Sequence, residues 1–106
     1  MIAVTVYKTP DGYQGFRSEG HADYAEEGED IVCAAVSVLT VNAVNSIEQF
    51  TEDAFAVRQD DGFLELELDG PVSKETKLLL DSMVLGLQEI EKSYGNEYIQ
   101  LIIKEV

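Results

Sequence analysis

Apolar side chains recur at every second position in three parts of the chain, and this spacing indicates β-strands. β-Branched residues alternate with other types over 2–7, and a Pro-Asp-Gly turn signal at 10–12 leads into a second predicted strand over 13–19. The segment 54–68 is organised in the same way, with an Asp-Asp-Gly turn between its two strands. A last strand is predicted over 98–105, which gives five strands in all.

Two longer segments have the length and spacing of α-helices. The segment 31–50 is apolar nearly all round, and Asp30 before it is a suitable N-cap. A single sheet covers only one face of such a helix, so we expect another helix or a second subunit to cover the remainder. A second helix is predicted over 74–94, with Gly95 or Asn96 as its C-terminal cap. Its predicted apolar stripe consists of Leu78, Leu79, Met83, Leu87 and Ile90.

The order of these elements predicts the fold class. Strand, strand, helix, strand, strand, helix, strand is typical of an α+β fold with a mostly antiparallel sheet and two long helices packed on one face. A chain of 106 residues has the usual size of one domain, so we expect a single domain over 1–106.

Charge narrows the range of partners. The chain has 21 acidic and seven basic residues, and its formal net charge is −14. Nucleic acid and anionic membrane surfaces are disfavoured because both are bound by clustered Lys and Arg. A basic protein or peptide would be attracted, although acidity also serves simply to keep a protein in solution.

The predicted compartment is the cytoplasm. One cysteine allows no disulfide within the chain, which is compatible with reducing conditions. The first eight residues lack the basic start and apolar core of a signal peptide. We find no run of 18 apolar residues, so no membrane-spanning segment is expected.

The single cysteine and single histidine form the most suggestive pair. His21 lies near the start of the aperiodic segment 20–29, which we interpret as a loop. Cys33 lies about one turn inside the predicted helix. Unpaired backbone N–H groups at a helix start favour a thiolate and can donate to an oxyanion. An imidazole has the right pKa to take and return a proton near neutral pH. Ser37 and Thr40 share the helix face of Cys33 and make it slightly polar.

Other interpretations of these residues remain open. A free cysteine among apolar neighbours is most often a small core residue, and a lone histidine in a loop is most often solvated. Asp30 is explained more simply as an N-cap than as a catalytic acid. One His and one Cys are too few for a typical zinc site, and we expect no metal and no cofactor. A thiol redox sensor would need a resolving cysteine from another molecule.

The segment Gly20–His21–Ala22, followed by Gly28 to Ser37, resembles the signature of the ribosomal-processing cysteine protease family. The resemblance implies that Cys33 is the nucleophile and His21 the base, with Gly20, Asp30 and Ser37 in supporting roles. Loop mobility is thought to matter at the glycine. Family members remove a short N-terminal extension from a large-subunit ribosomal protein, after an aromatic residue, and form homodimers.

The sequence therefore predicts a cysteine endopeptidase with a Cys–His dyad that trims a basic ribosomal protein. The competing class is a non-enzymatic, acidic, ribosome-associated binding module in which Cys33 is a core residue. Reactivity separates the two: a catalytic thiol reacts with iodoacetamide in the folded protein, whereas a core thiol reacts only after unfolding.

Overall fold

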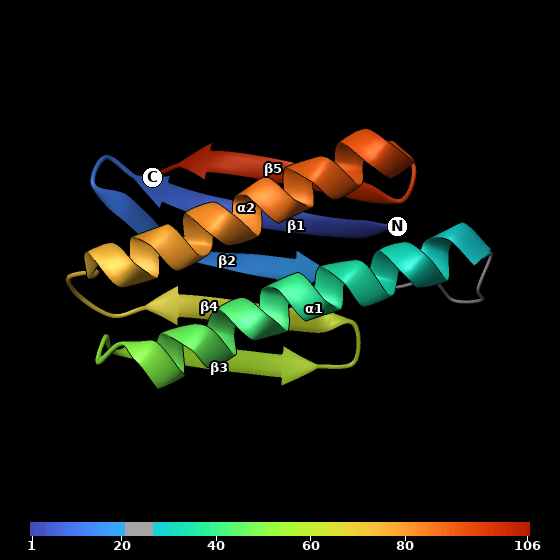
Figure 1. Cartoon of the computed structure of the whole chain (residues 1–106). Coiled ribbons are helices and arrows are strands. Elements are labelled where there is room, and N and C mark those ends of the chain that lie inside the picture. The colour runs from blue at the N-terminus through green and yellow to red at the C-terminus, as the bar shows by residue number, and fades with distance from the viewer. Residues whose placement is uncertain (21–26) are drawn as a thin grey trace.

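A computed structural model describes residues 1–20 and 27–106, with the side chains of 27–30 left out. Five strands and two helices follow one another in the predicted order (Figure 1). These elements are β1 (Ile2–Thr9), β2 (Gly12–Glu19), α1 (Glu27–Phe50), β3 (Phe55–Asp60), β4 (Phe63–Leu68), α2 (Lys74–Tyr94) and β5 (Ile99–Glu105).

The strands form one sheet in the order β3-β4-β2-β1-β5. Three of its pairings are antiparallel, and only β1 and β5 run parallel. Both helices lie on the same face of the sheet, which leaves the other face open (Figure 1). The predicted α+β class, with a mostly antiparallel sheet and two helices on one face, is confirmed.

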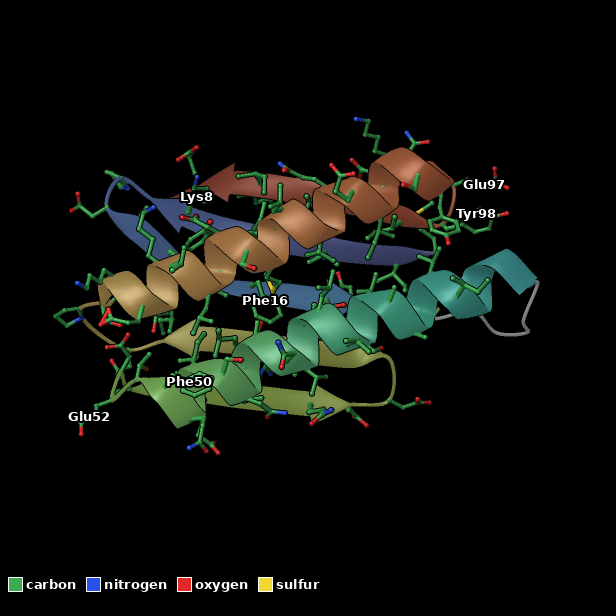
Figure 2. The ribbon with its side chains drawn as sticks, in the orientation of Figure 1. Lys8, Phe16, Phe50, Glu52, Glu97 and Tyr98 are labelled. Carbon is green, nitrogen blue, oxygen red and sulfur yellow. The ribbon has the colours of Figure 1, made fainter. Side chains whose placement is uncertain are left out.

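The core lies between the sheet and the two helices. Phe16, in the middle of the sheet, is fully buried beneath them (Figure 2). Alternation along each strand supplies the sheet side of this core, with Val4 and Val6 from β1 and Leu66 from β4. Tyr13 is buried as well, and its hydroxyl donates to the Asp81 carboxylate on α2.

Helix α1 begins earlier than the sequence suggested. It starts at Glu27, so the expectation of a loop over 20–29 is wrong for 27–29. Asp30 is therefore not the N-cap: its backbone lies in the first helical turn. An acidic residue in that turn still interacts favourably with the helix dipole, which explains why the sequence pattern was ambiguous. Residues 21–26 lie outside the described part of the chain.

Helix α2 has the predicted bounds, and its N-cap is Ser73, whose side chain accepts a hydrogen bond from the Thr76 backbone N–H. Gly95 follows with φ +85°, as the capping pattern predicted. The predicted stripe is confirmed for Met83 and Leu87, which are buried, and for Leu79 and Ile90, which pack against the core. It is wrong for Leu78, which is 68% exposed. Thr76 and Leu80 are buried as well.

The outward surface of the helical layer carries large apolar side chains, as expected for a helix that is apolar all round. Ile31 and Val38 on α1 and Leu78 and Leu85 on α2 are all about half exposed or more. We call these four residues the outer helical patch. In the described part of this chain, no other element covers them.

We expected no membrane-spanning segment, but α1 meets two simple criteria for one. The window Ile31–Phe50 has a mean hydropathy of 1.6, which makes it long and apolar enough to cross a membrane by length and composition. A third of this window is buried, including Val32, Val36 and Ile47 in the core. A helix that packs against a sheet meets the same two criteria, so the property is weak evidence for a membrane span.

Candidate active site

Cys33 lies on the face of α1 that packs toward the sheet. It is partly buried, in contact with the core, and its neighbours Val32 and Val36 are buried completely or nearly so. The simple core interpretation therefore has some support, because the thiol packs on apolar side chains. The thiol also has a second environment, since it forms part of the wall of a cavity.

The cavity beside Cys33 has a volume of about 240 Å³ and lies between α1, the sheet and the β3–β4 hairpin. We call it the Cys33 cavity. Helix α1 contributes Cys33, Val36, Ser37, Thr40 and Val41. The sheet and the hairpin contribute Ile2, Ser18, Gly20, Gln59, Asp60, Gly62, Phe63 and Leu64. A nucleophile in the wall of such a cavity is placed to meet a bound molecule.

The helical side of the cavity confirms one prediction. Cys33, Ser37 and Thr40 line the same space, as their spacing along the helix indicated. Ser37 is exposed, whereas Thr40 is only 2% exposed. The Thr40 hydroxyl donates to the Val36 carbonyl at 2.9 Å, so it is already satisfied within the helix.

Gly20 is held closely at the end of β2. Its backbone N–H donates to the Gly62 carbonyl at 2.9 Å, which ties it to the β3–β4 turn. Its φ is +105°, and a Cβ there would stand 2.3 Å from the Met1 carbonyl oxygen. Glycine is therefore required by backbone conformation and close approach at this position. A role for Gly20 in loop mobility stays a prediction.

The start of α1 does not supply the oxyanion site that the sequence suggested. Only the first four N–H groups of a helix lack intrahelical partners, and in α1 these belong to 27–30. Cys33 is the seventh residue of the helix, almost two turns in, and the dipole effect fades within the first turn. The argument for activation from the helix start is therefore wrong for Cys33.

Two predicted site groups lie beyond what the structure describes. His21 falls in the undescribed segment, and the Asp30 side chain is not described, so neither contact with Cys33 is tested. Among the described residues, no three His, Cys, Asp or Glu side chains gather as they would around a metal ion.

Apart from Gly20, sequence reasoning missed the sheet side of the cavity. Ser18 follows Phe16 on the inward face of β2, where a large apolar residue is the usual choice. A small polar residue at such a position was the available signal. The hairpin residues from Gln59 to Phe63 gave no such signal, because the pattern indicated only strand ends and a turn there.

Comparisons with known proteins show which family the chain resembles. A family model described as "Cysteine protease Prp" matches residues 1–100. The chain is 33% identical over 101 residues to the ribosomal processing cysteine protease Prp of Bacillus subtilis, covering 89% of this chain and 90% of that protein. It is 38% identical over 88 residues to the protein of the same name from Staphylococcus aureus (strain Mu50), covering 81% and 82%.

Solved structures show the same fold. The crystal structure of an essential ribosomal processing protease Prp from S. aureus in complex with a substrate peptide superposes with a TM-score of 0.89 at 33% identity, covering 98% of this chain and all of that chain. A second structure, with a covalently linked product peptide, gives a TM-score of 0.87 at 34% identity, with the same coverage. On the family match and these identities, the chain belongs to the Prp family of cysteine proteases.

Proposed function

We propose that this cysteine protease removes a short N-terminal extension from a large-subunit ribosomal protein in the cytoplasm, cleaving after an aromatic residue. The observation that carries the proposal is the position of Cys33, the only thiol of the chain, in the wall of a cavity. The named relatives are ribosomal processing proteases, and one of them was crystallised with a substrate peptide. The competing binding module gives no reason for a thiol in this place.

The proposed chemistry is acyl transfer by a Cys33–His21 dyad. The Cys33 sulfur attacks the scissile carbonyl carbon and forms a C–S bond as the C–N bond breaks. His21 takes the thiol proton and gives it to the leaving amine. It then takes a proton from water as that water attacks the thioester. As the C–S bond breaks, His21 returns this proton to the sulfur, which releases the carboxylic acid and restores the thiol. Gly20, Asp30 and Ser37 are proposed to support the dyad.

The charge of the chain suits a basic substrate. With a net charge of −14, the protein attracts the Lys- and Arg-rich segments that ribosomal proteins carry. The same charge makes direct binding to nucleic acid unfavourable. The proposed partner is therefore a basic peptide, and no metal or organic cofactor takes part in the proposed steps.

We also propose that the protein acts as a homodimer. The outer helical patch presents Val38 at 67% exposed and Leu85 at 61% exposed on neighbouring helices. A second copy would remove this apolar surface from water, which is favourable by roughly 25 cal/mol for each Å² buried. The patch faces away from the sheet, so its occupation leaves the open sheet face free.

The decisive experiment uses a peptide that carries the N-terminal extension of the host ribosomal protein. The wild type, Cys33→Ala and His21→Ala are each incubated with it, and the products are identified by mass spectrometry. We expect one cut after an aromatic residue by the wild type and no cut by either variant. Circular dichroism of both variants checks that they are folded.

Other results have distinct meanings. A cut that is lost only in Cys33→Ala would keep the nucleophile and replace His21 by another base. Tight binding of the peptide without any cut by the wild type would favour the acidic binding module. A cut after a residue that is not aromatic would keep the protease and reject the proposed specificity.

A further inference from the structure

The Cys33 cavity exists because one inward position of the sheet carries a small residue. Ser18 on β2 pairs with Val4 on β1 and with Leu64 on β4, so the three side chains stand in one row across the inner face. Val4 and Leu64 are buried, whereas Ser18 is partly exposed. A large apolar side chain at 18 would complete the row and extend into the cavity.

The opposite wall of the cavity is a stripe of α1 that leads away from Cys33. Cys33, Val36 and Thr40 follow one another at helical spacing, so a molecule that enters the cavity lies against this stripe of the helix. A side chain held in the cavity is therefore close to the thiol.

The cavity is large enough for an aromatic ring, and its wall carries both apolar and polar side chains. A cavity of about 150 Å³ is known to hold benzene, and this one measures about 240 Å³. The Thr40 hydroxyl already donates its proton to the Val36 carbonyl. Among the described residues, every buried side-chain nitrogen or oxygen atom has a hydrogen-bond partner. The volume of the cavity therefore limits the size of the side chain that it can hold.

We propose that the Cys33 cavity receives the side chain of the residue before the scissile bond, and that Ser18 sets how large this side chain can be. The inference rests on the proposed protease function and adds a specificity-determining residue to it. Ser18 does not touch the reacting atoms. It acts by leaving space in the row between β1 and β4, so its substitution changes which substrate is cut.

The test compares two peptides that differ only in having Phe or Ala before the scissile bond. Cleavage of both is measured as kcat/KM for the wild type, Ser18→Ala, Ser18→Val and Ser18→Leu. Ser93→Leu, at an exposed position near the end of α2, is the matched control. Binding of both peptides is measured in parallel with Cys33→Ala and with Cys33→Ala/Ser18→Leu. Thermal melting identifies any variant that is unfolded, in which case Ser18→Val decides.

We expect Ser18→Leu to lower the preference for Phe over Ala by about tenfold or more, which is the usual effect of a steric change of this size in a pocket. Ser18→Val should have an intermediate effect, and Ser18→Ala and Ser93→Leu should keep the wild-type preference. An unchanged preference in Ser18→Leu would overturn the assignment.

The binding measurements distinguish failure of the protease function from failure of the role proposed for the Cys33 cavity. If the wild type cuts neither peptide, the protease function is rejected, and the binding preference alone judges the cavity. A preference for the Phe peptide that Ser18→Leu removes would then support the cavity as a side-chain site. A preference that Ser18→Leu leaves unchanged would overturn it.

Discussion

Gly20 joins three parts of the molecule through its backbone alone. It directly follows β2, it donates to the Gly62 carbonyl of the β3–β4 turn, and it lies against the Met1 carbonyl. It also directly precedes His21, the proposed base. Any side chain at 20 has to displace backbone rather than a flexible side chain, so the disturbance passes directly to the proposed site.

We expect Gly20→Ala to lower the free energy of unfolding by about 1–3 kcal/mol, which is the usual cost of a strained backbone conformation. We also expect cleavage of the ribosomal peptide to fall strongly, because the approach to His21 is displaced. Urea denaturation and a cleavage assay measure the two effects. Gly12→Ala is the matched control, since a Cβ at Gly12 meets no atom within 4 Å. Wild-type stability and activity in Gly20→Ala would contradict this account.

At the residue scale, spacing predicted the helical side of the cavity but not its sheet side. Cys33, Ser37 and Thr40 were placed together because their positions differ by one and two helical turns. Ser18 lies on a different element, and only the packing of α1 on the sheet brings it to the cavity that Cys33 also lines. Asp30 was misassigned because an acidic residue suits both the N-cap and the first turn of a helix.

At the scale of elements, one carboxylate connects the segment after α1 to the start of α2. Asp53 accepts hydrogen bonds from the Ser73 N–H at 3.0 Å, the Ser73 hydroxyl at 2.7 Å and the Thr76 hydroxyl at 2.5 Å. The hydrogen bond from the Thr76 hydroxyl is the largest cause that lowers the pKa of Asp53 from its ordinary value. The bonds from the Ser73 hydroxyl and the Ser73 backbone N–H lower this pKa further. The negative charge also lies beside the positive end of the α2 dipole.

We expect Asp53→Ala to lower the free energy of unfolding by about 1–2 kcal/mol at pH 7, since it removes a charged acceptor from a helix start. Urea denaturation measures this loss. Glu52→Ala is the control, because it removes the same charge from an exposed neighbour. Equal losses in both variants would show that only net charge matters.

The same carboxylate predicts a dependence on pH. The pKa of Asp53 is lower in the folded protein than in the unfolded chain, where it is about 3.9. Its contribution is therefore complete well above pH 4 and is lost as the pH falls through the folded-state pKa. The stability difference between wild type and Asp53→Ala should shrink between pH 5 and about pH 2. A difference that stays constant over this range would contradict the assignment.

The elements themselves could be predicted well from the sequence, because strand alternation and turn residues repeat in both hairpins. The start of α1 could not, since 27–29 are acidic and glycine-containing and lack apolar periodicity. Leu78 was wrongly included in the stripe of α2 in place of Leu80, because Leu78, Leu79 and Leu80 are consecutive and the sequence does not show which of them faces the sheet.

At the scale of the whole molecule, the open question is what covers the outer helical patch. We expect the wild type to have twice the 11.7 kDa mass of one chain by light scattering after size exclusion. Val38→Asp should have the mass of a single chain, because a charge in an apolar interface is costly. Ile102→Asp, on the open sheet face, should keep the dimer. A monomeric wild type, or equal dissociation in both variants, would reject the patch as the interface.

The net charge of the molecule makes a separate prediction about encounter with substrate. An attraction between a chain of charge −14 and a basic peptide weakens with salt, because the Debye length falls from about 30 Å at 0.01 M to about 3 Å at 1 M. We expect kcat/KM for the ribosomal peptide to fall by about tenfold between 0.02 M and 0.5 M salt, in keeping with steering effects of this kind. A peptide with Gln in place of Lys and Arg outside the scissile region is the control. Its kcat/KM should start lower and change little, and an equal decline for both peptides would show that salt acts on the enzyme itself.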